Sequence, residues 1–391
     1  MKAIKQAVIL LPLMVLGACV EQYYPQGDDL FTGTLVINAQ ISNTPGKQSI
    51  QISRSDGLLY PEFIPESNCL VEVENEEGDR VLFSENSPGF YEGEILPSFM
   101  NYGTHYLLRV VTQEGKVYVS DYVELRRPTA INKVYYELEN LPTESPFDTL
   151  QGLQFFIDFE IDQDSSEYMR WEMVETYEFR NPDYEGYIFS YDRRLKPIPD
   201  SLADRRCWIT GMVNEIFTLD VANVSGSEYV RMPLHMVTNQ TQRLSYGYSL
   251  LIRQHSLDQS AFRYWDELKK NSYEGGGLYD RLPSLTPSNI SNENDPEEYV
   301  LGFFTVSGVS ETRIFVGDIE GFSKYNVFFC LPTAEMPRLR YLLWQDLPIY
   351  LSRAEDPETG EELFGETSHK CLDCRVRKGS SGHPPDFWPT N

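Results

Sequence analysis

Short segments that alternate apolar and polar residues follow one another along the chain, with turn signals between them. The segment Leu35–Ile41 is followed by the turn-like Asn43–Gly46, and the alternation resumes over Ser49–Arg54 and again over Tyr106–Val111. A period of two places every second side chain on one face of a strand, so the pattern predicts strands rather than helices. Short strands separated by Gly- and Pro-bearing turns predict an antiparallel β-sandwich over residues 30–127, of the immunoglobulin-like or transthyretin-like kind.

A second β-rich region is expected over residues 128–353. Its strand candidates include Gln154–Phe159 and Leu244–Arg253. The segment Tyr168–Phe179 has a length that suits a strand or a helix, and its alternation and aromatic content favour a strand. Residues 354–391 are polar and contain Pro and Gly, so this tail is expected to be irregular. The sequence therefore predicts a mainly β protein with two β-rich domains.

One helix is expected within the second region. Ser256 is a suitable N-cap, and Gln259 follows it at the spacing of a capping box. Apolar residues then recur at helical spacing, at Ala261, Trp265 and Leu268. The second domain is therefore predicted to contain at least one helix beside its strands.

The first residues have the pattern of a lipoprotein signal peptide. Two lysines precede the apolar stretch Ala7–Leu16, which is too short to span a bilayer. Small residues then precede Cys19, as in the bacterial lipobox, where the Cys thiol accepts a diacylglyceryl group. We therefore expect residues 1–18 to be removed and Cys19 to be lipidated. The alternative is an ordinary secretory signal with an incidental cysteine.

The charge of the chain restricts its partners. Acidic residues outnumber basic residues 59 to 33, which gives a formal net charge of -26. This disfavours nucleic-acid binding, because phosphate binding requires a basic surface. Anionic lipid headgroups repel so acidic a body. We expect acyl chains to hold the protein on the membrane, and residues 19–29, which contain Pro, Gly and acidic side chains, to act as a tether.

Three longer stretches, Ser245–Asn271, Pro287–Val316 and Cys371–Pro389, carry a family resemblance together with the lipobox. In these stretches the chain resembles a family of Bacteroidota lipoproteins, the domain-of-unknown-function family 4249. The resemblance implies an outer-membrane lipoprotein whose gene lies near that of a TonB-dependent outer-membrane receptor. It implies no catalytic residues.

The chain contains six cysteines: Cys19, Cys69, Cys207, Cys330, Cys371 and Cys374. An exported protein retains disulfides, and the close pair Cys371 and Cys374 favours a disulfide over free thiols. A zinc site that adds His369 and His383 to this pair is a third interpretation. A bond from Cys330 to one of the tail cysteines is a further alternative. The remaining two, Cys69 and Cys207, are interpreted as buried apolar residues.

No catalytic motif stands out. The chain lacks the HExxH, G-x-S-x-G, P-loop and G-x-G-x-x-G patterns. Aromatic residues gather in Tyr184–Tyr191, which suits either a sugar- or peptide-binding loop or the interior of a sheet. We therefore predict no catalytic residues, no metal site and no cofactor.

Two further sets of residues are singled out. Thr149 and Ser201 lie in Asp-Ser/Thr-apolar triplets beside prolines, which resemble O-glycan acceptor sites of Bacteroidota. Phe387 and Trp388 lie between prolines at the end of the tail. Large aromatic side chains are costly to leave in water, so these two are predicted to act as an anchor, on the body of the protein or on a partner.

Together these observations favour a non-enzymatic binding or accessory component of the outer membrane that works with a TonB-dependent transporter. A cell-envelope hydrolase and a structural or adhesin-like surface lipoprotein are the alternatives. A hydrolase requires a pocket with perturbed carboxylates, whereas an accessory requires a groove or a docking face. The sequence does not indicate the ligand or which side of the membrane the body occupies.

Overall fold

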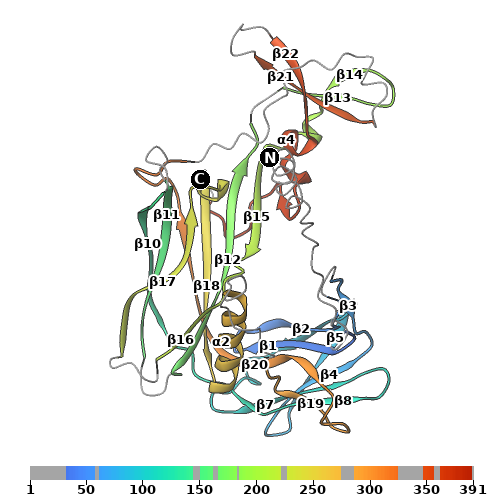
Figure 1. The fold of residues 1–391 in the computed structure, drawn as a ribbon, viewed down its shortest axis with the longest axis vertical. Coiled ribbons are helices and arrows are strands. Elements are labelled where there is room, and N and C mark those ends of the chain that lie inside the picture. The colour runs from blue at the N-terminus through green and yellow to red at the C-terminus, as the bar shows by residue number, and fades with distance from the viewer. Residues whose placement is uncertain are drawn as a thin grey trace, which may run out of the picture.

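The computed structural model describes residues 32–57, 61–143, 150–161, 166–182, 185–221, 227–273, 286–324, 347–355 and 362–389. Strands make up 54% of the structure and helices 9%, which confirms the prediction of a mainly β protein with several sheets. The molecule is elongated (Figure 1): one group of strands lies at its lower end, long strands run upward from it, and a small sheet forms the upper tip.

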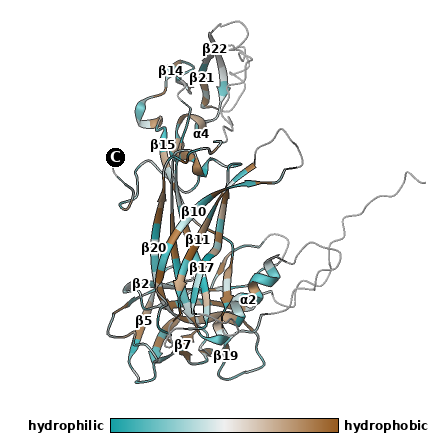
Figure 2. Cartoon of the chain, turned by 90° about the vertical axis from the view of Figure 1, so that its left-hand side faces the viewer, coloured by the Kyte–Doolittle hydropathy of each residue, from teal (hydrophilic) through white to brown (hydrophobic). Residues whose placement is uncertain are grey.

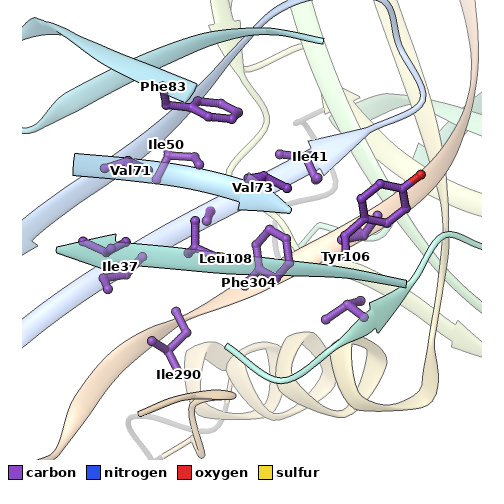
Figure 3. Close-up of a cluster of buried hydrophobic side chains, with 14 of the residues drawn as sticks. Ile37, Ile41, Ile50, Val71, Val73, Phe83, Tyr106, Leu108, Ile290 and Phe304 are labelled. Carbon is purple, nitrogen blue, oxygen red and sulfur yellow. The ribbon is translucent and has the colours of Figure 1, made fainter. Parts of the chain in front are cut away.

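The lower group is built mainly from the N-terminal part of the chain. Its strands are β1 (Leu35–Ser42), β2 (Gly46–Arg54), β3 (Ile64–Pro65), β4 (Leu70–Asn75), β5 (Arg80–Ser87), β6 (Phe90–Ile95), β7 (His105–Val111), β8 (Val117–Ser120), β9 (Val123–Glu124) and β19 (Ile290–Asn292). They pair in the order β19-β8-β7-β4-β5-β6-β2-β1. Their inward side chains form the first hydrophobic core, in which Ile37, Ile50, Val73, Leu108 and Phe304 are fully buried (Figure 3).

The strand β20 (Val300–Val316) joins the two halves of the molecule. Its first part runs parallel to β1, with Leu35 opposite Val300. Its second part runs antiparallel to β18 (Gly247–Leu257), with Ser256 opposite Gly308. The first core includes side chains of β19 and β20, so residues far beyond position 127 complete it.

The second core lies between two sheets. The strands that build them, besides β18 and β20, are β10 (Ile131–Leu141), β11 (Leu150–Glu160), β12 (Tyr168–Arg180), β15 (Arg206–Met212), β16 (Phe217–Asp220), β17 (Glu228–Thr238) and β23 (Ser380–Ser381). One sheet has the order β10-β11-β17, and it faces the long strands β12, β18 and β20. Phe155, Phe159, Trp171 and Tyr248 are buried between them. The predicted strand Tyr168–Phe179 is thus confirmed as β12.

A small third sheet forms the upper tip in Figure 1. Its order is β14 (Leu195–Pro197), β13 (Gly186–Phe189), β21 (Ile349–Glu355) and β22 (Glu362–Thr367). Phe189, Ile349 and Leu351 are buried beneath it. Part of the aromatic segment singled out in the sequence therefore lies in a sheet, with Phe189 turned into a core.

The predicted helix is present as α2 (Gln259–Tyr273), but its N-cap differs from the prediction. The Asp258 side chain accepts a hydrogen bond from the Ala261 backbone N–H at 2.7 Å, which is the contact of an N-cap. Ser256 instead belongs to β18 and is fully buried, and its hydroxyl accepts the Thr129 backbone N–H at 3.0 Å. The helix lies at the surface and shows mostly hydrophilic residues in Figure 2.

The C-terminal tail is more ordered than predicted. It contributes β22, the short helix α4 (His369–Leu372), the 3₁₀ helix η5 (Cys374–Val376) and β23. Other 3₁₀ turns are η3 (Asp200–Leu202) and η4 (Gln242–Leu244). Although the tail has few apolar residues of its own, β23 pairs with β15 and β22 pairs with β21, so the body supplies the partners. Within the described residues, no helix has the length and apolar character needed to cross a membrane.

Candidate functional site

A polar groove of about 240 Å³ lies where the two halves of the molecule meet. Its residues come from the end of β1, the β1–β2 turn, the start of β2 and the strands β12, β18 and β20. The polar side chains that line it include Gln40, Ser42, Gln48, Glu172, Arg253, His255 and Ser307. Because β20 pairs with both β1 and β18, it fixes the two walls of the groove relative to each other.

One wall of the groove is formed by arginine and glutamate side chains in successive ion pairs. The last arginine donates a hydrogen bond to the side-chain amide of Gln40. Arg170 Nη1 donates to Gln40 Oε1 at 2.8 Å, and Arg170 Nη2 lies 3.3 Å from Glu172 Oε2. Arg253 Nη1 donates to the other oxygen of Glu172 at 3.0 Å, while its Nε lies 3.3 Å from Glu311. Burial lowers the pKa of Arg170 to about 10, and the attraction of Glu172 opposes this effect.

The Trp265 ring, on helix α2, packs against Arg170 behind this wall. The Arg170 guanidinium carbon lies 3.8 Å from the centroid of the Trp265 ring, which is cation–π geometry. A buried guanidinium is stable only with partners on several sides. Arg170 has Gln40 on β1, Glu172 on its own strand β12 and Trp265 on α2, so two strands and one helix fix its position.

The floor of the groove contains a histidine and a serine. His255 Nδ1 lies 2.9 Å from Ser307 Oγ, within hydrogen-bond distance. Burial lowers the pKa of His255 well below its ordinary value, and the positive charges of Arg170 and Arg253 lower it further. The imidazole is therefore neutral at pH 7. Its Nε2 is buried and has no hydrogen-bond partner among the described residues.

The rim is formed by the β1–β2 turn, which one glutamine holds in place. Gln48 accepts the Ser42 backbone N–H at 2.8 Å and donates to the carbonyl oxygens of Ser42 at 2.9 Å and Thr44 at 2.7 Å. Lys47 also lines the groove at the rim, and its amino group lies 3.5 Å from Glu92. Side-chain hydrogen bonds thus preorganise the turn.

The sequence prediction missed the groove. Arg253 ends the predicted strand Leu244–Arg253, and His255 lies just beyond it, among the polar residues near the end of β18. Ionisable residues directly after the apolar run Leu250–Ile252 were the available signal, because such residues are seldom buried without a partner. Their convergence with Glu172 and Ser307 depends on strand pairing across distant parts of the chain, which a single sequence does not display.

A second buried cluster of ionisable groups lies between the two sheets of the second core. Glu175 accepts hydrogen bonds from Arg243 at 3.1 Å and from the Tyr248 hydroxyl at 3.0 Å. His235 lies 3.5 Å from Glu215 and 4.0 Å from Glu175. Burial lowers the pKa of His235, and the two carboxylates partly oppose this effect. Within the described ranges, no group of His, Cys, Asp and Glu is arranged to hold a metal ion.

The cysteines do not pair as the sequence analysis favoured. Cys374 forms a disulfide with Cys207, whose Cα atom is 5.9 Å away. Cys371 is also disulfide-bonded, so a Cys371–Cys374 bridge is excluded and the proposed zinc site lacks its two thiolates. Cys207 is buried, as predicted, but it is bonded rather than free. Cys69 is a free cysteine, and Cys330 lies outside the described residues.

The two aromatic residues at the end of the tail pack on the body. The Trp388 ring makes edge-to-face contacts with Trp208 at 6.4 Å and with Phe315 at 6.2 Å between centroids. A Cβ on Gly247 would lie 3.0 Å from the Trp388 ring, so that ring rests on the backbone of β18. Phe387 lies under the Arg313 guanidinium at 3.6 Å. The anchor is therefore intramolecular.

The structure describes only one of the remaining predicted sites. Residues 1–29, with Cys19, and the acceptor Thr149 lie outside the described residues. Ser201 is exposed in the 3₁₀ turn η3, and its carbonyl oxygen accepts a hydrogen bond from Arg375. Lipidation of Cys19 and glycosylation of Thr149 and Ser201 stay predictions.

Comparisons with known proteins identify a family. No curated protein matches the chain. Among solved structures, trypsin-activated alpha-2-macroglobulin from Escherichia coli is similar at 10% identity, covering 88% of this chain and 22% of its own, with a TM-score of 0.18. The native conformation of the E. coli alpha-2-macroglobulin is similar at 9% identity, covering 87% of this chain and 16% of its own, with a TM-score of 0.16. The chain thus spans less than a quarter of these structures, and TM-scores this low do not establish a shared fold.

A family model described as "Domain of unknown function (DUF4249)" matches residues 20–313, which include the first core, most of the second core and every residue that lines the groove. The chain therefore belongs to the DUF4249 family.

Proposed function

We propose that the protein is a lipid-anchored, non-enzymatic binding component of the bacterial outer membrane that works with a TonB-dependent transporter. The lipobox at Cys19 supports the anchor, and the resemblance to Bacteroidota lipoproteins supports the membrane and the partner. The polar groove between the two cores is the observation that carries the binding role.

The groove has the properties of a preformed binding site. Its rim is fixed by Gln48, and its wall by the paired charges of Arg170, Glu172 and Arg253. Binding to a site whose side chains are already ordered loses less conformational entropy. In the wall, each charged group is held by an opposite charge, an arrangement that suits recognition better than proton transfer.

The test is a native pull-down of the tagged full-length protein from detergent-solubilised outer membranes. Co-purification of a TonB-dependent transporter is the expected result. The Cys19→Ser variant serves as the control for the anchor, because only a thiol accepts the diacylglyceryl group. This variant should stay unprocessed and be absent from the outer-membrane fraction. A wild-type protein processed in the presence of globomycin, or purified without any transporter, would contradict the proposal.

A hydrolase is the second candidate, favoured by the contact between Ser307 Oγ and His255 Nδ1 at 2.9 Å. A serine next to a neutral imidazole is the beginning of a nucleophile–base pair. A fluorophosphonate probe tests it, because it labels serines that are activated in this way. Labelling that Ser307→Ala abolishes and Ser49→Ala retains would favour the hydrolase. Absence of labelling in the folded wild-type protein would leave the binding role as the better proposal.

A further inference from the structure

The charges around the groove are compensated within the protein. Arg253 is paired with Glu172 at 3.0 Å and with Glu311 at 3.3 Å. Arg170 is paired with Glu172 at 3.3 Å, and Lys47 lies 3.5 Å from Glu92. A charged ligand must therefore compete with an existing ion pair, and the whole chain, at -26, also repels anions.

The floor adds polar atoms without adding charge. The imidazole of His255 is buried and neutral, and it shares a hydrogen bond with the Ser307 hydroxyl. Its Nε2 has no hydrogen-bond partner in the part of the chain that the structure describes. That nitrogen is enclosed by protein atoms, so a ligand meets a neutral floor that offers it no ionic partner at this point.

The remaining lining combines hydroxyl, amide and small apolar groups. Ser42, Thr44 and Ser49 supply hydroxyls, and Pro45 and Val309 supply apolar surface. At about 240 Å³ the groove is smaller than the roughly 300–1,000 Å³ of pockets for drug-sized ligands. It therefore suits a ligand about the size of one ring.

We propose that the groove binds a neutral sugar ring, either a free monosaccharide or the terminal residue of a glycan chain. Each sugar hydroxyl both donates and accepts, so it is able to bond to the adjacent carboxylate and guanidinium of Glu172 and Arg253 without separating them. The C–H faces of the ring would contact Pro45 and Val309. This inference rests on the proposed binding function and names its ligand class.

The test is a titration of the purified mature protein with a panel of sugars, followed by calorimetry or saturation-transfer NMR. The panel contains galactose, glucose and mannose, their neutral disaccharides, and the charged analogues galacturonate and glucosamine. We expect saturable binding of at least one neutral sugar, and binding of its charged analogues about tenfold weaker. Equal binding of a monosaccharide and its disaccharides would indicate a terminal residue, and binding of the monosaccharide alone would indicate a free sugar.

A pair of tryptophan substitutions provides a blocked groove and a matched control. Ser49 is exposed and lines the groove, and it lies opposite Glu92 on β6. Ser84 is also exposed, lies opposite the same Glu92 on the other side, and is outside the groove. Ser49→Trp should weaken sugar binding by about tenfold or more, whereas Ser84→Trp should leave it unchanged. Equal melting temperatures of the two variants show that the fold is retained.

A third variant tests the role of charge balance. Glu172→Gln keeps the shape of the side chain but leaves Arg170 and Arg253 with less compensation. We expect it to shift preference from galactose toward galacturonate. The inference is overturned if no neutral sugar binds saturably at millimolar concentration, if a charged analogue binds more tightly to the wild type, or if Ser49→Trp retains full binding. A wild-type protein that binds no sugar but still co-purifies with a transporter would reject this inference alone. A wild-type protein that binds sugar but co-purifies with no transporter would reject the transporter partnership alone.

Discussion

A Cβ atom added to Gly308 would lie 2.2 Å from the carbonyl oxygen of Arg126, so the two backbones are in direct contact. Gly308 is the position at which β20 leaves β1 and begins to pair with β18. Arg126 lies in the segment that leaves the first core. Strand β20, which pairs with both halves of the molecule, therefore crosses the segment around Arg126, which connects the halves in sequence. The crossing point is Gly308.

Gly308→Ala should destabilise the protein, because the methyl group forces two backbones apart. Overpacking of this kind typically costs about 1–3 kcal/mol in the free energy of unfolding. Gly317→Ala is the matched control, since a Cβ there would meet nothing within 4 Å. Urea denaturation of both variants measures the difference. Equal stability of the two variants would mean that the crossing adapts without strain.

Removal of the Cys207–Cys374 disulfide should lower stability. The bond closes a loop with a sequence separation of 167, and loss of a native disulfide typically costs about 2–5 kcal/mol. Cys374→Ser should therefore lower the melting temperature under oxidising conditions. Cys69→Ser, at the free cysteine, should change it little. A Cys374→Ser variant that melts with the wild type would show that the bond does not stabilise the tail.

Trp388→Ala should loosen the end of the tail. The ring is half-buried against Trp208 and Phe315, so its removal should cost about 1–3 kcal/mol, less than for a fully buried tryptophan. Tyr122→Ala is the control, because that side chain is 53% exposed. Chemical denaturation gives the stability, and limited proteolysis reports release of the tail. Unchanged stability and protease resistance in Trp388→Ala would contradict the anchor.

Mild acid should destabilise the protein through its buried histidines. Burial lowers the pKa of His255 and of His235 below the ordinary value of 6.5, so the unfolded chain binds protons more readily than the folded one. The contribution of these neutral histidines to the free energy of unfolding is therefore complete above about pH 6.5. It decreases as the pH falls toward the folded-state pKa, by at most about 1.4 kcal/mol per pH unit for each histidine.

The His255→Gln variant isolates this effect. Melting temperatures between about pH 7.5 and 5.5, a range above the titration of most carboxyl groups, should depend less on pH in the variant than in the wild type. His383→Gln, at an exposed position, should follow the wild type. Parallel curves for all three proteins would show that His255 does not contribute to acid sensitivity.

Local patterns predicted the strands well. The predicted strands Leu35–Ile41 and Tyr168–Phe179 correspond to β1 and β12, because alternation with a period of two depends only on residues that are close in sequence. The predicted helix cap failed because Ser256 extends β18, which pairs with β12 and β20 on its two sides. Long-range strand pairing outweighed the local capping preference at that residue.

The groove and the disulfide depend on contacts that are distant in sequence. Gln40 and Arg170 meet by a hydrogen bond, although β1 and β12 belong to different halves of the molecule. The sequence does not indicate that Cys207 pairs with Cys374, because the two lie 167 positions apart, in the second domain and in the C-terminal tail. The packing of the tail was easier to predict, since aromatic residues between prolines already favour contact with other groups, although the sequence does not indicate that Trp388 meets Trp208 and Phe315 or that Phe387 stays 39% exposed.

The shared strand β20 also sets the order in which the protein is able to fold during synthesis. The partner of Leu35 is Val300, so the N-terminal strands exist for most of translation without the neighbour that covers β1. Until residues 300–307 emerge, β1 is an open edge next to an unfinished core that still lacks Phe304. Open edges of this kind pair readily with other chains. Truncated products that end before β20 should therefore aggregate, because about three-quarters of the sequence precedes the strand that covers β1.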